Sequence, residues 1–260
     1  MPYLYTAMKN NESPVLKSMG YFVSNESANN CFNEKFESQF VLGNDILVCP
    51  VRSNAKSIEV YFPYADSKTA AWYSIHSDIR YKQGTSAFVS AAMSQLPIFV
   101  KAGSVIPEII PSKIENTQSK SDTLLLHVYV NDEGYYFGKV YNDDGMSLKN
   151  ENFTDYYEYQ FKGTGTNSTF HEVQIERIGG SRKTDYTFIQ FVIHGISNRV
   201  SPKFAIDQKS VAANKQKGTH FGLKQDLYKV EKITETATPT YYITTPWPSA
   251  DKLKISFTTN

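Results

Sequence analysis

The stretch QLPIFVKAGSVIP, residues 95–107, decides how the chain is interpreted. It is a dense apolar run with one lysine, Lys101, in its middle and one glycine, Gly103, shortly after. A proline lies towards each end, and proline cannot donate a hydrogen bond to a strand ladder. Such a run is typical either of a buried structural strand or of the rim of an active site. The rest of the sequence has to separate these two interpretations.

Composition and charge limit the classes of protein to consider. The chain has 260 residues, 40% of them hydrophobic, which is enough for one large domain or two of ordinary size. Its 27 basic and 26 acidic residues leave a net charge of +1, so we expect no nucleic-acid partner. No stretch approaches the ~18 consecutive apolar residues of a membrane span, so we expect none. The two cysteines, Cys31 and Cys49, follow no zinc or CxxC spacing, and we expect both thiols to be free.

Short aromatic runs separated by Gly, Pro, Asn and Asp fill the chain after residue 40. This pattern predicts strands. The predicted strands are residues 57–63, 70–75, 96–107, 123–130, 135–141, 157–163, 170–178, 186–196, 203–206, 228–234, 240–245 and 252–258. Because turns arrive about every 8–12 residues and no helix separates successive strands, the pattern favours antiparallel β-sandwiches.

One short helix is predicted at the start of the chain. Leu4 and Met8 stand four residues apart there, before Asn10 and Asn11 end the pattern. A polar, unpatterned stretch at residues 112–122 indicates a domain boundary or a long connection. The sequence therefore predicts an all-β chain of two sandwich units that meet near residue 115, preceded by a short helix.

Histidines and glycines give no recognisable cofactor or metal motif. The histidines show no H-x-x-x-H or H-E-x-x-H spacing, and no glycine-rich phosphate loop precedes a helix. We interpret each histidine as a surface or strand residue and expect no cofactor and no metal site. These histidines are His76, His127, His171, His194 and His220.

The acidic stretch YNDDG, residues 141–145, has two interpretations. Paired carboxylates can perform acid/base catalysis or bind calcium. However, neighbouring strand residues point to opposite faces, so Asp143 and Asp144 cannot easily flank one glycosidic bond. Asp-Gly between two strands is also a strong hairpin signal, and we favour the turn.

Trp72 and Tyr73 are the candidate sugar-stacking residues. Aromatic faces suit the C–H surfaces of a pyranose ring, and further aromatic residues lie nearby in the sequence. The alternative is that the two rings alternate into and out of a sandwich core. We favour the core interpretation.

The order of the motifs resembles one known family. The segments MPYLYTAM, SPVLKSMGYF, SQFVLGNDILVCPV, IEVYFP, WYS, LPIFVKAGSVIP and VYNDDG begin at residues 1, 13, 38, 58, 72, 96 and 140. They are similar, in the same order, to the C-terminal third of glycoside hydrolase family 31, which contains α-glucosidases and α-xylosidases. The similarity extends to about residue 165, and beyond that only the β-pattern agrees.

The resemblance implies a domain organisation and an answer about residues 95–107. Residues 1–36 would be the last helix and strand of a catalytic (β/α)8 barrel, residues 37–115 a proximal sandwich and residues 116–260 a distal one. The apolar run would be a structural strand of the proximal sandwich, with Lys101 facing outward and Gly103 permitting a bend. Lys17 and Ser18 depart from the Arg-Pro that the family usually has at these positions.

The resemblance also implies which chemistry this chain lacks. The two catalytic aspartates and the substrate-binding histidine of the family lie on barrel strands upstream of the Pro-Tyr-Leu-Tyr motif, so no residue here would be catalytic. The implied partners are the missing barrel and the oligosaccharide substrate of the parent enzyme. The alternatives are a non-catalytic carbohydrate-binding β-sandwich module and a plain structural module.

Overall fold

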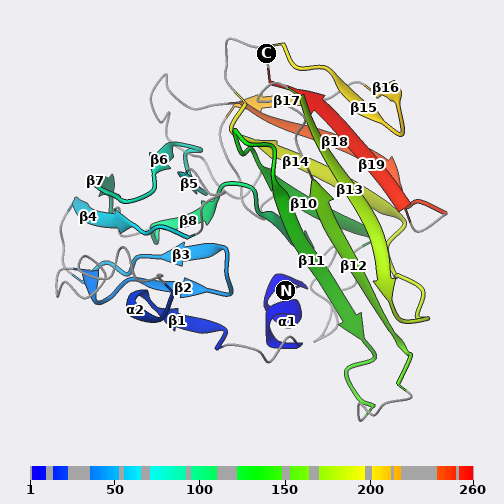
Figure 1. Cartoon of the computed structure of the whole chain (residues 1–260), viewed down its shortest axis with the longest axis horizontal. Helices are drawn as coiled ribbons and strands as arrows, with labels where there is room; N and C mark the ends of the chain where they lie inside the picture. The colour runs from blue at the N-terminus through cyan, green and yellow to red at the C-terminus, as the bar shows by residue number, and fades with distance from the viewer. Residues whose placement is uncertain are drawn as a thin grey trace.

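The computed structural model describes residues 2–9, 14–22, 36–52, 56–65, 71–91, 95–109, 122–147, 153–163, 170–196, 201–211, 214–217, 239–249 and 252–259. These residues form mostly strands, arranged as two β-units that lie side by side with a short helix between them (Figure 1). The all-β fold class predicted from the sequence is confirmed. The predicted strand at 228–234, Cys31 and His220 lie outside the described residues.

The first unit contains one six-stranded antiparallel sheet and one two-stranded sheet. The larger sheet has the order β1-β2-β3-β8-β5-β6, and the smaller pairs β4 with β7. The bounds are β1 Leu16–Ser18, β2 Phe40–Leu42, β3 Ile46–Val48, β4 Ser57–Phe62, β5 Ala71–Ser74, β6 Arg80–Lys82, β7 Thr85–Ser90 and β8 Ile98–Lys101. Apolar side chains of β4 and β7 share a core with those of β2, β3, β5 and β8, so the two sheets form a sandwich.

The second unit packs a five-stranded sheet on a six-stranded one. Their orders are β17-β18-β14-β10-β9 and β11-β12-β13-β19-β15-β16. In the first sheet the bounds are β9 Val105–Ile109, β10 Thr123–Tyr129, β14 Phe188–His194, β17 Asn214–Lys217 and β18 Pro239–Pro246. In the second they are β11 Tyr136–Asp143, β12 Tyr156–Gly163, β13 Phe170–Gly179, β15 Phe204–Ile206, β16 Lys209–Val211 and β19 Lys252–Thr258. Alternating apolar residues of both sheets fill the core between them.

One strand pair departs from the antiparallel prediction. β10 and β14 run parallel, from Thr123 opposite Phe188 to Tyr129 opposite His194. The chain between them forms β11, β12 and β13 in the opposite sheet, so it returns to β10 by crossing the sandwich instead of making a hairpin. The parallel pair therefore results from a long crossover connection.

The apolar run at 95–107 is two strands, so its prediction as one continuous strand is wrong. β8 belongs to the first unit and β9 to the second, and the chain turns between them at Gly103, whose φ is +84°. A Cβ on Gly103 would lie 2.5 Å from the carbonyl oxygen of Tyr135, so only glycine fits. Pro107 is tolerated because β9 is the edge strand of its sheet. The run is structural, and it carries the chain from one unit to the other.

The helix α1 (Pro2–Lys9) confirms the predicted N-terminal helix. A second short helix, α2 (Met19–Phe22), follows β1 directly. The resemblance implied a barrel strand in this region, whereas β1 here pairs antiparallel with β2 as an edge strand of the first unit. Lys17 of β1 is buried, donates to the side-chain oxygen of Asn44, and has its pKa lowered by desolvation.

A third apolar cluster joins the two units. It contains Ile46, Val48, Ala71, Tyr73, Ile75, Val100, Ala102, Ile106 and Tyr129. Its members come from the first unit's sheet and from β9 and β10 of the second. Elsewhere in the first unit, the thiol of Cys49 is free and buried, and burial raises its pKa. The thiol is thus a small core side chain without thiolate reactivity.

Candidate functional site

Trp72 and Tyr73 lie on β5 and point to opposite faces of their sheet, as neighbouring strand residues do. The Trp72 ring is 0% exposed in the core of the first unit, and its Nε1–H donates to the carbonyl of Pro63 at 2.9 Å. Tyr73 is buried in the cluster between the units, where its hydroxyl donates to the carbonyl of Val130 at 2.9 Å. Burial raises the pKa of the Tyr73 hydroxyl. These positions favour the core interpretation over sugar stacking.

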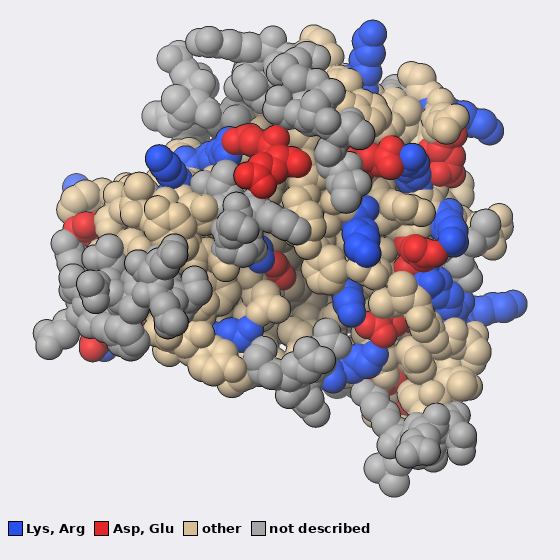
Figure 2. Space-filling view, in the orientation of Figure 1, with Lys and Arg blue, Asp and Glu red and all other residues tan. Residues whose placement is uncertain are grey.

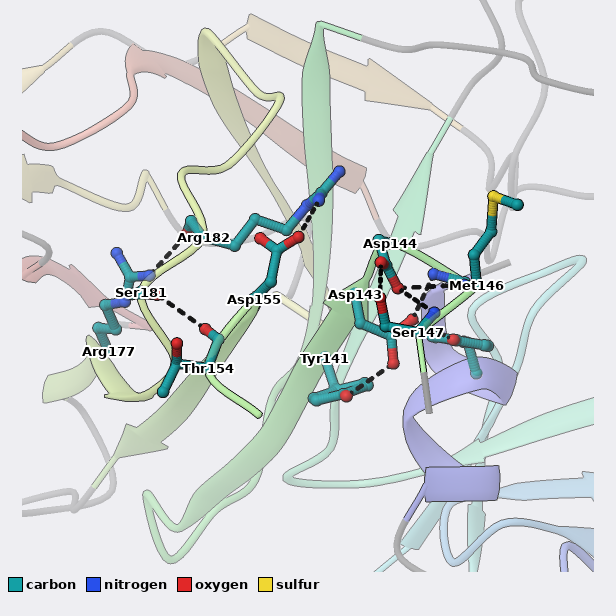
Figure 3. Close-up of polar contacts among 12 residues, drawn as sticks. Tyr141, Asp143, Asp144, Met146, Ser147, Thr154, Asp155, Arg177, Ser181 and Arg182 are labelled. Carbon is teal, nitrogen blue, oxygen red and sulfur yellow. Dashed lines mark hydrogen bonds and ion pairs between the residues drawn. The ribbon is translucent and has the colours of Figure 1, made fainter. Parts of the chain in front are cut away.

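Asp143 ends β11 and is held by local contacts. Its Oδ1 accepts from the backbone N–H of Gly145 at 2.9 Å, and its Oδ2 accepts from the hydroxyl of Tyr141 at 2.7 Å (Figure 3). The hydroxyl of Tyr5 on α1 also donates to this carboxylate. Gly145 has a φ of +68°, as a turn at Asp-Gly requires, but the connection from Asp143 to its strand partner Tyr156 is longer than the tight hairpin that Asp-Gly predicts. The Asp143 carboxylate therefore fixes a turn and fastens α1.

Asp144 is partly exposed and accepts from the residues that follow it. Its Oδ1 accepts from the N–H groups of Met146 and Ser147, each at 3.0 Å, and its Oδ2 from the Ser147 hydroxyl (Figure 3). Hydrogen bonds from Ser147 and Met146 lower the pKa of Asp144. A carboxylate already occupied by its own turn is a poor acid or base for a substrate. The contacts thus favour the turn interpretation of YNDDG.

The helix α1 is fastened to both units by polar contacts. The hydroxyl of Tyr3 donates to the carbonyl of Leu42 in the first unit at 3.0 Å, and burial raises its pKa well above the usual value. In the second unit, the N–H of Tyr141 donates to Oγ1 of Thr6 at 2.9 Å. Lys9 pairs with Glu158 at 2.8 Å and lies 4.2 Å from the centre of the Tyr141 ring. The two units therefore hold α1 between them (Figure 1).

The outer side of the N-terminal segment remains apolar and open. Met8 is 61% exposed, Leu16 62% and Tyr21 58%, although each is a large hydrophobic side chain. Single exposed hydrophobic residues are ordinary, but these three lie within one short segment and share the exposure with Tyr5. We call Met8, Leu16 and Tyr21 the open apolar residues.

An apolar cavity lies where α1 meets both units. Its volume is about 470 Å³, and its walls are aliphatic side chains of β3, β8 and β9 together with the start of α1. Glu108 of β9 is the carboxylate on this wall. Glu108 is the one carboxylate among the described lining residues, so the cavity does not bring together the two carboxylates of a glycosidase.

Charged side chains are interleaved on the outer face of the second unit (Figure 2). Lys252 pairs with Glu176 at 2.6 Å and Lys254 with Glu172 at 2.8 Å, both between β13 and β19. Opposite charges on neighbouring strands are typical of a solvated sheet surface.

Metal-binding clusters and membrane-spanning helices are both missing from the residues that the structure describes. Within them, no group of three or more His, Cys, Asp or Glu side chains is arranged to hold a metal ion. Within the same residues, no helix is long and apolar enough to cross a membrane.

Sequence reasoning missed that two of the isolated histidines meet. His127 and His194 are 67 residues apart and both buried, and their ring nitrogens approach to 2.9 Å. They lie on β10 and β14, the strands whose parallel pairing the sequence does not indicate. No local pattern could have found this contact, because it depends on that pairing.

The comparisons with known proteins agree with the fold. Residues 12–106 match the family model for the glycosyl hydrolase family 31 C-terminal domain. This match identifies a C-terminal domain of glycoside hydrolase family 31 within the chain. The chain corresponds to the C-terminal portion of the family's proteins, and the resemblance recognised in the motifs is confirmed.

Relatives in family 31 are distant and much longer. A neutral α-glucosidase AB from Sus scrofa is 25% identical over 50% of this chain, and the match covers 14% of that protein. An α-xylosidase from Saccharolobus solfataricus is 28% identical over 45% of the chain and 15% of its own length. The chain thus spans about a seventh of these curated relatives.

Solved structures of family 31 match almost the whole chain. A dextranase from Flavobacterium johnsoniae superposes on 99% of it with a TM-score of 0.72 and 19% identity, covering 31% of the dextranase chain. An α-1,4-glucan lyase from Gracilariopsis lemaneiformis covers 98% with a TM-score of 0.66 and 17% identity. At such identities the likeness concerns the fold, and it extends past residue 165, where the motifs end.

Proposed function

We propose that this chain is the C-terminal support of an α-glucosidase-like enzyme that hydrolyses O-glycosyl bonds. In the parent enzyme two carboxylates about 5–5.5 Å apart would act on the glycosidic bond, one as nucleophile and one as acid/base. This chain would supply neither. Its role is to hold the last elements of the catalytic barrel in place beside the oligosaccharide site.

The observation that carries the proposal is the state of α1. Tyr3, Thr6 and Lys9 fasten one side of the helix to both units through polar contacts. The other side and the following segment leave Met8 and Leu16 open to solvent. A helix fastened on one side and apolar on the other is what the end of a barrel requires when sandwiches support it.

We also propose a division of the chain into three parts. Residues 1–36 are the barrel remnant, residues 37–115 the proximal sandwich and residues 116–260 the distal sandwich. Strand pairing refines this division, because β9 pairs with β10 and so joins the distal unit before residue 115. We therefore propose the turn at Gly103, in place of residue 115, as the boundary between the two sandwiches.

The open apolar residues give a direct test. Replacing Met8, Leu16 and Tyr21 together by glutamine should lower the fluorescence of a bound apolar dye by about twofold, because it removes three exposed apolar side chains without changing charge. Phe88→Gln is the control, since Phe88 is 73% exposed on β7 and far from α1 in sequence. Equal dye binding by the triple variant and the wild type would contradict an unpartnered barrel-facing surface.

Catalysis gives the second test. The purified chain should not hydrolyse p-nitrophenyl α-glucoside above the rate in buffer, because it holds no proposed catalytic carboxylate. A complete family 31 α-glucosidase serves as the positive control. Turnover that follows this chain through purification would refute the supporting role, and Asp143→Asn with Asp144→Asn would then show whether the YNDDG turn is responsible.

A further inference from the structure

A chain of buried polar side chains crosses the boundary between the two sandwiches. Glu108, His127, His194 and Thr240 come from β9, β10, β14 and β18, which are neighbours in one sheet. Asp78 comes from the turn between β5 and β6 of the first unit. Two of these four side chains, His194 and Thr240, contact the Asp78 carboxylate from the other unit.

Hydrogen bonds connect these groups in one line. His127 Nε2 lies 2.9 Å from Glu108 Oε2, and His127 Nδ1 lies 2.9 Å from His194 Nε2. His194 Nδ1 lies 3.1 Å from Asp78 Oδ1, and the Thr240 hydroxyl donates to Asp78 Oδ2 at 3.0 Å. His127, His194, Asp78 and Thr240 are all buried, and only Glu108 at the cavity wall is partly exposed.

Backbone strain in the first unit supports a role for Asp78. Its φ is +54°, a left-handed conformation that is unfavourable for residues with a Cβ. Backbone hydrogen bonds from Asp78 N–H to Ser74 and from Ser74 N–H to Ile79, each 2.9 Å, hold this tight turn. Glycine would relieve the strain but could not place a carboxylate against His194. The contact of Asp78 with the second unit therefore accounts for the residue at this position.

The line of hydrogen bonds needs more protons than two neutral histidines supply. Ionised carboxylates only accept hydrogen bonds, so His127 Nε2 and His194 Nδ1 must each carry a proton. Two neutral imidazoles would then point bare lone pairs at each other across 2.9 Å. The His127–His194 hydrogen bond needs one more proton. The three hydrogen bonds of the line need one proton each. Two neutral histidines supply two N–H protons and ionised carboxylates supply none, so one proton is missing.

The surroundings indicate where the extra proton lies. Burial, opposed by the hydrogen bond to Glu108, lowers the pKa of His127, which keeps that ring neutral. His194 faces the Asp78 carboxylate through Nδ1. Its ring stacks on Tyr129, with centroids 4.4 Å apart and an angle of 6°, and an aromatic face suits a cation.

We propose that Glu108, His127, His194 and Asp78 form a proton-holding clasp that fastens the two sandwiches together and is satisfied only when it binds one extra proton. Asp78 is the group that the first unit inserts, and the other three are the receptor in the second unit. Glu108 is the end of the clasp through which the proton exchanges with solvent.

The clasp makes the stability of the joint depend on pH in two directions. In the unfolded chain the two histidines have ordinary pKa values of about 6.5, so at pH 6.5 each is half protonated and the pair carries about one extra proton. The folded clasp also carries one extra proton, so folding neither takes up nor releases a proton at this pH. Above it the unfolded state binds fewer protons than the clasp, so stability falls as pH rises. Below it the unfolded state binds more, because the lowered pKa of His127 keeps that ring neutral when folded. The clasp therefore fastens best near pH 6.5.

Neighbouring titratable groups stay in one form over this range. Burial raises the pKa of Tyr129 well above its usual value and that of Tyr242 to about 12, so both hydroxyls remain protonated. Burial also raises the pKa of Tyr73, which lies on the first-unit side near Asp78. Arg80 beside it stays charged, and its guanidinium is paired with Asp132.

Glu108→Gln separates the clasp from other sources of pH dependence. The glutamine amide donates to His127 Nε2, which lets His127 Nδ1–H donate to His194 and His194 Nδ1–H donate to Asp78. Two neutral imidazoles then satisfy every link, and no extra proton is required. The unfolding equilibrium constant of the wild-type chain should rise up to about tenfold per pH unit above pH 7 relative to this variant, until the clasp releases its proton.

The measurement is denaturant unfolding of the full chain from pH 5 to pH 9. His171→Gln is the control, because His171 is buried but bonds Tyr136 and Thr259 outside the clasp. It should lower stability and keep the wild-type slope above pH 7. Equal slopes for wild type and Glu108→Gln would overturn the proposal.

Nitrogen-15 spectra of the histidine rings in the wild-type chain test the proton count without relying on a variant. At pH 7 we expect three N–H groups in all on the His127 and His194 rings, together with a strongly deshielded proton between the rings. A single N–H on each ring would overturn the extra proton even if the variants fail to fold.

Discussion

Trp72→Ala should lower the free energy of unfolding by about 3–5 kcal/mol, because it removes the largest fully buried side chain of the first unit. The loss combines the transfer free energy of the ring with the cavity left among its neighbours, which include Phe22 at a centroid distance of 6.2 Å. It also leaves the carbonyl of Pro63 without the indole donor. A shift of the urea midpoint at unchanged slope measures the effect.

Phe88→Ala is the matched control for Trp72→Ala. Phe88 is an aromatic residue of the same unit that is mostly exposed, so its truncation should change stability by about 0.5 kcal/mol or less. The sugar-stacking interpretation expects the opposite ranking, in which Trp72→Ala leaves stability near the wild-type value and abolishes binding of maltose. That result would show that Trp72 binds sugar and does not stabilise the core.

Gly103→Ala should destabilise the chain by about 3 kcal/mol through two separate effects. At a φ of +84° any side chain is strained, which costs roughly 1–2 kcal/mol. The new Cβ would also lie 2.5 Å from the backbone oxygen of Tyr135 and 2.9 Å from Nδ2 of Asn131, so the turn between β8 and β9 must shift. Thermal or denaturant unfolding gives the size of the loss.

Gly145→Ala separates the cost of a positive φ from the cost of a steric clash of the new Cβ. Its φ of +68° is similar, but a Cβ there would meet no atom within 4 Å. This variant should lose only the conformational part, about 1 kcal/mol. If both variants lose the same amount, the close approach of Tyr135 to Gly103 has no energetic weight, and the turn is less constrained than its geometry indicates.

Local patterns in the sequence predict much of this fold. Alternation of apolar residues locates strands such as β4, β10 and β19, because each buries one face or both against a core. The Asp-Gly turn after β11 follows from backbone preferences of those two residues alone. Alternation along β5 would expose either Trp72 or Tyr73, whereas both are buried because the two faces of β5 pack against different cores.

Long-range pairing is what the sequence does not determine. Residues 95–107 read as one strand because both halves are apolar, and only the partners of β8 and β9 reveal the break. The parallel pairing of β10 with β14 depends on where three intervening strands settle. Contacts across it, above all His127 with His194, and the approach of Asp78 from the other unit have no signal in any local window.

The passage from β8 to β9 limits how the two sandwiches can move. Only Ala102, Gly103 and Ser104 separate a strand of one sheet from a strand of the other, and all three are buried. A connection of three residues is too short to let the units rotate independently. A rotation of one unit would strain the hydrogen bonds that β8 or β9 makes in its own sheet. The two sandwiches should therefore move as one rigid body, so that a force applied to one is transmitted to the other.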